Sequence, residues 1–388
     1  MQHHIPVWSS KSTLRDFKEC LEDGGSRRHI SREDIHQSVA MTALLRVRHN
    51  RNVVARKFSW LQTNLSRIAS IQQFGVAAVG DRMSAVLWLA RDAHEADSAE
   101  YDHIFDTVIR VRCLFGGTFR CYPSREECMA ADMKIGDVIA LDECAAAPAS
   151  VHKFRPITCF GYSGCKLQDQ DSVQKRSSSW GSQNVTVVRA QDADQQLQVM
   201  CNSLSVNNNR RKRTQYINQG DQHFIYTKLR WFHQQFIDSF TSFGELRVYI
   251  TAVPDSTGLR RRRGEIAVVA KTDFLPNKEM SVRRIQAEDF LHITPLSELD
   301  LRTFALYVYD NLRARDDWFT SFESLEVGVR LDITVSPRER GSTRQFFVNE
   351  ITRWYEASFF SRNLCALPHD ALIARFAQAF HEYFPPSS

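Results

Sequence analysis

The stretch 328–361, near the C-terminal end of the chain, constrains the fold more than any other. It predicts two short strands joined by a polar turn, because apolar and polar residues alternate along each half. Pro337, Gly341 and Ser342 supply residues typical of a turn. The first strand places Val329, Leu331, Ile333 and Val335 on one face and Arg330, Asp332 and Thr334 on the other. The second places Phe346, Val348 and Glu350 on one face and Phe347, Asn349 and Ile351 on the other.

If these strands pair antiparallel, Asp332 and Glu350 can lie on one surface, with opposed Cβ atoms about 4.5–5.5 Å apart. Two carboxylates at that spacing repel each other unless a cation or a shared proton lies between them. The pair therefore indicates a site for a divalent metal, with Arg330 beside it for an anionic group. The alternative is that these charges simply form the solvated face of a half-buried sheet.

Length and composition indicate an ordinary soluble globular protein of two or three packed units. The chain has 388 residues, of which 43% are hydrophobic and 24% charged, with a net charge of +5. Nine cysteines without a C-x-x-C pair argue against a disulfide framework. The N-terminal residues contain no apolar core, so a signal peptide is not expected, and no apolar run approaches the ~20 residues of a membrane helix. We therefore expect a cytoplasmic protein that does not enter a membrane.

Residues 1–150 are expected to form an N-terminal α/β domain of unclear role. Apolar residues at helical spacing predict helices at 52–74 and 83–96. Short apolar runs next to glycines predict strands at 107–112 and 137–141. No chemistry can be assigned to this part of the chain from its sequence.

A candidate phosphate-binding loop follows at 172–188. A strand ending at Lys175 leads into a turn rich in serine, with Gly181, and a second strand then runs through Val185 and Val188. Small residues allow backbone N–H groups to approach phosphate oxygens, and a lysine adds a point charge. The Walker pattern is absent, so the alternative is a serine-rich surface hairpin with an incidental lysine.

The C-terminal half adds further elements with clear periodicity. Strict alternation predicts a strand at 246–252, and 265–271 is expected to pair with it. Helical spacing predicts helices at 299–313 and 371–384, the second of which should pack on the sheet. In the first of these helices the apolar face consists of Leu301, Phe304, Val308 and Leu312.

Three segments together resemble the ATP-grasp ligases. The R-x-D of the first strand, followed by N-E and then Arg353 on the second, resembles the last strands of that family. The loop after Lys175 resembles the family's glycine-rich loop, although it contains one glycine where the family often has more. The run 234–237 resembles the hinge between lobes, and 244–248 resembles the strand that opens the third domain, with Gln235 where the hinge often has glutamate.

The resemblance implies an α+β fold of ATP-grasp type, in which two α/β lobes enclose the nucleotide. The lobes would be 151–240, which holds the phosphate loop, and 241–388, which holds the metal site. The implied ATP-binding residues are Lys175, Ser179, Gly181, Ser182, Gln234, Gln235, Phe236, Ile237, Glu245 and Arg247. The implied magnesium ligands are Asp332, Asn349 and Glu350, and Asn349 would need a bulge to share their face.

The implied reaction activates a small carboxylate as an acylphosphate, which an amine or similar nucleophile then attacks. Phosphoryl transfer needs mainly positioning and charge neutralisation, which Lys175 and Arg330 would supply. Arg353 would bind the acceptor carboxylate in a bidentate manner. The acceptor, the nucleophile and the oligomeric state are not predicted.

Two other functions stay open. The chain is alternatively a nucleotide-binding or scaffold protein that keeps the fold without turnover, as the sparse glycine loop and Gln235 suggest. A nucleic-acid-binding protein that uses the arginines of 210–213 and 260–263 is less favoured, because the second cluster lies in a short loop without interleaved aromatic residues. Nucleic-acid binding would weaken steeply with salt.

Overall fold

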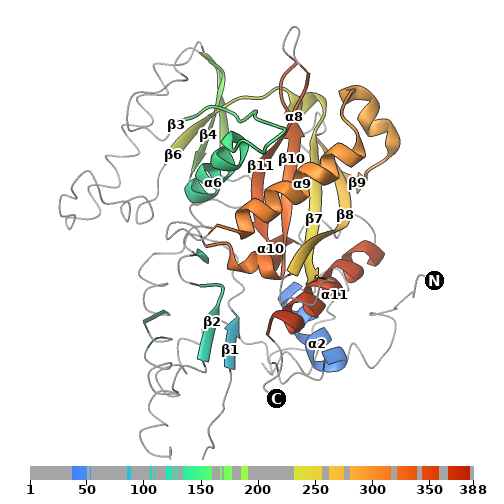
Figure 1. Ribbon diagram of the computed structural model, residues 1–388. Coiled ribbons are helices and arrows are strands. Elements are labelled where there is room, and N and C mark those ends of the chain that lie inside the picture. The colour runs from blue at the N-terminus through green and yellow to red at the C-terminus, as the bar shows by residue number, and fades with distance from the viewer. Residues whose placement is uncertain are drawn as a thin grey trace, which may run out of the picture.

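Within the residues that it describes, the computed structural model contains three sheets, and helices cover both faces of the largest one (Figure 1). It is described for residues 37–49, 53, 85–88, 105–106, 109, 119–124, 127–128, 134–159, 167, 170–176, 185–190, 231–255, 262–274, 280–315, 321–338, 343–357 and 366–384. Within these residues no helix is long and apolar enough to cross a membrane.

The largest sheet is antiparallel and has the strand order β11-β10-β7-β8-β9. Its strands are β7 (Glu245–Pro254), β8 (Arg262–Phe274), β9 (Met280–Arg284), β10 (Gly328–Val335) and β11 (Phe346–Arg353). The predicted strands at 246–252 and 265–271, and the predicted pair within 328–361, are thereby confirmed.

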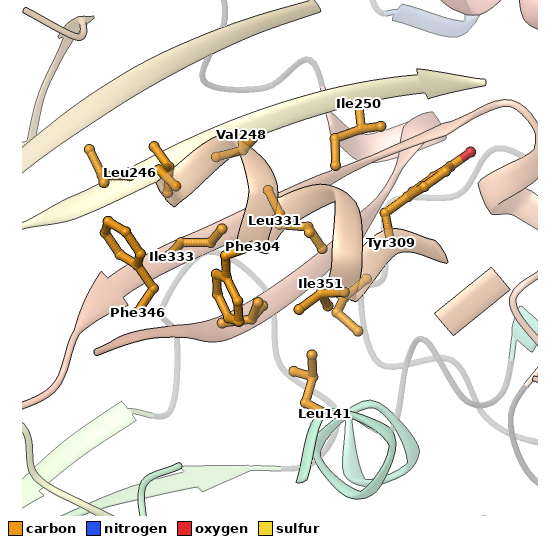
Figure 2. Packing of buried hydrophobic residues seen from close by; sticks show 14 of the residues in the cluster. Leu141, Leu246, Val248, Ile250, Phe304, Tyr309, Leu331, Ile333, Phe346 and Ile351 are labelled. Atoms are coloured by element: carbon orange, nitrogen blue, oxygen red, sulfur yellow. The ribbon is translucent and has the colours of Figure 1, made fainter. Parts of the chain in front are cut away.

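Two layers of helix cover this sheet. On one face, α9 (Glu298–Arg313) and α6 (Ile135–Ala146) enclose a core with apolar side chains of β7, β10 and β11 (Figure 2). On the other face, α11 (Ala366–Tyr383) and α2 (Gln37–His49) enclose a second core, which contains Tyr249 and Trp354. The predicted packing of the last helix on the sheet is correct.

Helix α9 follows its sequence closely. Ser297 and Asp300 form a reciprocal capping box at its start. The four apolar residues predicted for one face, Leu301, Phe304, Val308 and Leu312, are all buried in the core.

Because both faces of the sheet are covered, the polar residues of β10 are not solvated. All eight residues of this strand are buried, including Arg330, Asp332 and Thr334. The alternative of a half-exposed charged sheet face is therefore wrong for this strand. Buried charges require partners, and the partners of these residues form the candidate site.

A β-bulge in β11 changes which residues share a face. Asp332 is opposite Glu350, as predicted, but Ile333 is opposite Val348, so Asn349 is an extra residue in the strand. Ile351 (Figure 2) consequently packs in the core that also contains Val348. The expectation that Ile351 faces away from Val348 was wrong, because simple alternation ignores the inserted residue.

The second sheet has four antiparallel strands in the order β3-β6-β4-β5. These are β3 (Thr158–Cys159), β6 (Trp231–Gln235), β4 (Ser172–Arg176) and β5 (Val185–Val188). The two strands predicted on either side of the candidate phosphate loop are confirmed. The loop itself, at 177–184, lies outside the described residues.

Three predictions for the N-terminal part were wrong. The run 137–141 lies in helix α6 rather than in a strand, Ala85–Trp88 forms strand β1 rather than part of a helix, and Ile109 is helical rather than extended. Strand β1 pairs in parallel with β2 (Phe119–Tyr122). Periodicity cannot distinguish a buried helix segment from a strand in such short apolar runs. The helix predicted at 52–74 lies outside the described residues, apart from Val53.

Candidate functional site

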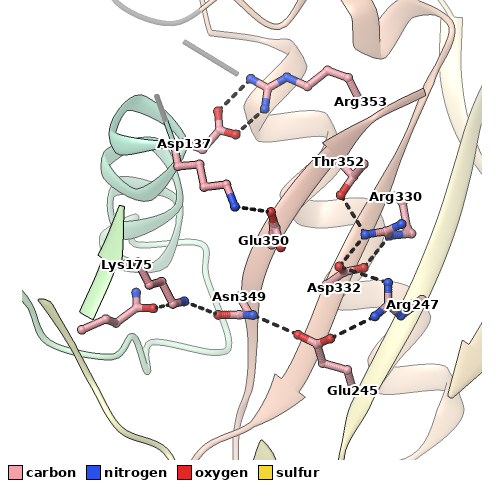
Figure 3. A network of polar contacts seen from close by, with 12 residues as sticks. Asp137, Lys175, Glu245, Arg247, Arg330, Asp332, Asn349, Glu350, Thr352 and Arg353 are labelled. Atoms are coloured by element: carbon pink, nitrogen blue, oxygen red, sulfur yellow. Dashed lines mark hydrogen bonds and ion pairs between the residues drawn. The ribbon is translucent and has the colours of Figure 1, made fainter. Parts of the chain in front are cut away.

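The polar residues of the large sheet join a lysine of the small sheet in one continuous network (Figure 3). It extends from Lys175 on β4, through Asn349 on β11, to Glu245 and Arg247 on β7, and on to Arg330 and Asp332 on β10. Residues from both sheets therefore meet at the bulge in β11.

Asp332 is the most enclosed carboxylate of the network. Its Oδ1 accepts from Arg330 Nε at 2.7 Å, and its Oδ2 accepts from Arg330 Nη2 at 2.8 Å. Arg247 Nη1 lies 3.6 Å from the same Oδ2. Arg330 also donates to Thr352 Oγ1 at 2.9 Å. This bidentate geometry fixes both side chains, and two guanidinium groups lie against the buried carboxylate.

Glu245 lies beside this pair at the start of β7. Its Oε1 accepts from Asn349 Nδ2 at 2.9 Å, and its Oε2 lies 3.5 Å from Arg247 Nη2. Burial, together with the neighbouring Asp332, raises the pKa of Glu245 to about 7. This carboxyl therefore changes its charge near neutral pH.

Lys175 connects the two sheets. Its ammonium donates to Gln234 Oε1 at 2.8 Å and to Asn349 Oδ1 at 3.3 Å. Burial lowers the pKa of Lys175 to about 8, although Glu350 opposes the shift. The bulge that inserts Asn349 into β11 makes this bridge possible, because it turns the amide toward Lys175 and Glu245.

Glu350 is the open carboxylate of the site. Its side chain is 41% exposed, and Lys134 Nζ lies 2.9 Å from its Oε1. Lys134 precedes helix α6 and has a left-handed backbone with φ of 52°, which is uncommon for a residue other than glycine. Burial would raise the pKa of Glu350, but Lys134 lowers it to about 2.

Arg353, predicted to bind the acceptor, lies in a separate buried cluster. Its guanidinium donates through Nη1 to Asp137 Oδ2 and, at 2.7 Å, through Nη2 to Asp137 Oδ1. Its Nε lies 3.7 Å from Glu127, which accepts from the Ser324 backbone N–H at 2.8 Å. Only 2% of the Arg353 side chain is exposed. As placed, Arg353 holds α6 against β11.

The predicted hinge residues lie where β6 leaves the small sheet. Gln234 bonds Lys175, and Gln235 makes backbone and side-chain bonds with Ile157. The Phe236 N–H donates to the Asp171 carbonyl at 3.0 Å, and Ile237 is buried. The Phe236 amide is therefore already paired. Ser179, Gly181 and Ser182 lie outside the described residues.

Sequence reasoning missed Lys134, Asp137 and Glu127. All three precede residue 150, in the region to which no chemistry was assigned. Asp137 is 216 residues from Arg353 in sequence, and no local pattern links two positions so far apart. The positions of acidic and basic residues in short apolar segments gave no usable signal.

No protein-family model matches the chain, and no curated protein matches its sequence. Several solved structures are similar to it, and two of them are described here. One is the crystal structure of D-cycloserine synthetase DcsG, with TM-score 0.41, 13% identity, and coverage of 84% of this chain and 94% of that one. The other is a RimK domain ATP-grasp protein from Sphaerobacter thermophilus, with TM-score 0.40, 11% identity, and coverage of 83% and 97%.

Both of these matches cover most of this chain.

Proposed function

We propose that this protein binds ATP with magnesium where the two sheets meet, and that it uses ATP to activate a carboxylate for attack by an amine or similar nucleophile. The observation that supports this proposal most is the bridge from Lys175 to Asn349, next to Glu350. It brings a lysine of the small sheet to oxygen ligands of the large one. The phosphates of a nucleotide need a positive side chain such as this lysine, and the magnesium bound to them needs oxygen ligands.

Lys175 and Lys134 are the proposed phosphate-binding cations. In the free protein, Glu350 neutralises Lys134 at 2.9 Å, and amide oxygens hold Lys175. Both ammonium groups can exchange these partners for phosphate oxygens, which are stronger acceptors because they are charged. Arg247 and Arg330 lie deeper in the site and contribute positive potential without moving.

Glu350 and Asn349 fit magnesium by the chemistry of their donor atoms. Magnesium prefers oxygen ligands and is commonly bound by one or two carboxylates together with phosphates and water. Glu350 is half-exposed, so its carboxylate is accessible to an ion. When bound, magnesium would neutralise part of the charge on the phosphates. Within the described residues, no group of three or more histidine, cysteine, aspartate or glutamate side chains is placed to hold a metal ion, so phosphates and water would have to supply most of the ligands.

The proposed reaction has two steps. A carboxylate oxygen of the acceptor attacks the γ-phosphorus of ATP, and ADP leaves, which gives an acylphosphate. The nucleophile then attacks the acyl carbon, and inorganic phosphate leaves. Lys175 and Lys134 would hold the phosphate oxygens in place, which is most of what phosphoryl transfer requires of a protein. Arg353 has no part in these steps, because Asp137 already occupies its guanidinium.

Thermal unfolding in the presence of ATP, of magnesium, and of both tests the binding part of the proposal. A ligand that binds only the folded state raises the midpoint as the logarithm of its concentration over its Kd. We expect a rise with both ligands that exceeds the rise with either alone. No rise at millimolar ATP would contradict the proposal.

A nucleotide-binding protein without turnover is the second candidate. It is favoured by Asp332, whose two oxygens are fully engaged by guanidinium groups. This candidate predicts ATP binding without ADP release, whichever carboxylate and amine are added. The nucleic-acid alternative has less support, because Arg262 of the arginine cluster lies 3.2 Å from Glu382 and 3.9 Å from Glu326.

A further inference from the structure

The two paired carboxylates of the site differ in their access to an added cation. Asp332 and Glu350 are opposite each other across β10 and β11. The Asp332 side chain is 3% exposed, whereas that of Glu350 is 41% exposed. A cation from solvent therefore reaches Glu350 first.

The two carboxylates also differ in the cation that each already has. Arg330 bonds both oxygens of Asp332 at 2.7 and 2.8 Å and is itself held by Thr352 at 2.9 Å. The side chain of Arg330 is only 5% exposed. If an ion displaced it, a guanidinium would stay buried without its carboxylate, which is strongly unfavourable.

An added cation can displace Lys134 from Glu350 more easily than it can displace Arg330 from Asp332. The Nζ of Lys134 lies 2.9 Å from Oε1 of Glu350, and the Lys134 side chain is 28% exposed. A lysine ammonium on its flexible four-carbon stem can move aside and remain solvated. Exchange of a cation at Glu350 therefore leaves no charge buried and unpaired.

We infer that this site takes one divalent cation, at Glu350, and that Arg330, which already occupies both oxygens of Asp332, excludes a second ion there. Asp332 is then a positioning residue for Arg330 rather than a metal ligand, which revises the role that the sequence predicted for it. This inference rests on the proposed function of the site.

Electron paramagnetic resonance of manganese, as a substitute for magnesium, tests this inference by counting bound ions. The full-length protein is titrated with Mn²⁺ in the presence of an equimolar non-hydrolysable ATP analogue. We expect one bound Mn²⁺ per protein chain at saturation. Two bound ions would overturn the inference and leave the proposed function standing. If the protein binds no analogue, with or without Mn²⁺, the proposed function itself fails.

Two isosteric variants locate the ion. Glu350→Gln should weaken Mn²⁺ binding by at least about tenfold, because affinity depends on the charge of the ligands. Asp332→Asn keeps an oxygen for Arg330 and should leave the Mn²⁺ affinity within about twofold of wild type. Equal losses in the two variants would overturn the inference. If Asp332→Asn does not fold, the ion count of the wild type decides.

Discussion

Asp332 and Glu350 are opposite each other across two adjacent strands, yet each carboxylate is neutralised by a different cation from a different part of the chain. Arg330, two residues away on the same strand, holds Asp332. Lys134, which precedes helix α6, contacts Glu350. The protein thus separates two negative charges that would otherwise repel each other, and it leaves only one of them accessible.

Replacing Lys175 tests its proposed contact with phosphate. Lys175→Ala should weaken ATP binding by about tenfold or more, the usual loss for a charge-assisted hydrogen bond. Adenosine has no phosphate, so its affinity should change by less than about twofold. Isothermal titration calorimetry measures both. Lys153→Ala, at an exposed lysine, is the control, and equal losses of ATP and adenosine would place Lys175 away from the phosphates.

ATP affinity should decrease as pH rises through about 8, because Lys175 has a pKa of about 8 and loses its charge there. Lys175→Ala should lack this inflection. The contribution of Lys175 to the free energy of unfolding should instead increase with pH. Since the folded pKa lies below the ~10.4 of an unfolded lysine, the unfolded chain binds more protons between these values, and this residue contributes stability that rises with pH from about 8. A pH-independent affinity in the wild type would contradict the assignment.

Glu245→Gln should flatten the pH dependence of stability in weakly acidic solution. The pKa of Glu245 is raised to about 7, above the ~4.3 of an unfolded glutamate. Between these two pKa values the folded state binds more protons than the unfolded state. The contribution of Glu245 to stability is therefore fully present below about pH 4 and is lost as the pH rises through about 7. Urea unfolding of both proteins at pH 5 and pH 8 measures it. An equal pH dependence in the two proteins would show that Glu245 is already ionised at pH 5.

Asp137→Asn should destabilise the fold by about 3 kcal/mol, because it leaves the Arg353 guanidinium buried without its bidentate partner. Asp142→Asn on the same helix is the matched control. Its carboxylate pairs with Arg155 but is 41% exposed, so its loss should cost less than about 1 kcal/mol. Urea unfolding measures both. If Asp137→Asn is as stable as wild type, Arg353 is not held as described.

The sequence was sufficient to predict the two strands around Asp332 and Glu350, because apolar and polar residues alternate along the first strand and turn residues separate it from the second. It was not sufficient to place Asn349. A bulge depends on how two strands fit together, and the residues flanking Asn349 continue the alternating pattern as if it were absent. The prediction that Asn349 shares a face with Asp332 and Glu350 was conditional on such a bulge, and the pairing of β10 with β11 contains one.

The cations from the N-terminal part could not be predicted at all. Lys134 and Asp137 reach the large sheet only because α6 packs against β11 and α9. The same helix was expected to be a strand, since the run from Val138 to Leu141 is apolar and short. Tertiary packing decided both its structure and its role, and neither leaves a trace in local periodicity.

Isothermal titration calorimetry of ATP into wild type and Glu350→Gln, each with and without magnesium, tests the central claim most directly. In the wild type, we expect magnesium to increase the ATP affinity by at least about tenfold, through the carboxylate of Glu350. In Glu350→Gln, magnesium should have little effect, while the protein still unfolds cooperatively at a similar temperature. If the two proteins respond equally to magnesium, or if neither binds ATP, the nucleotide site is not where the two sheets meet.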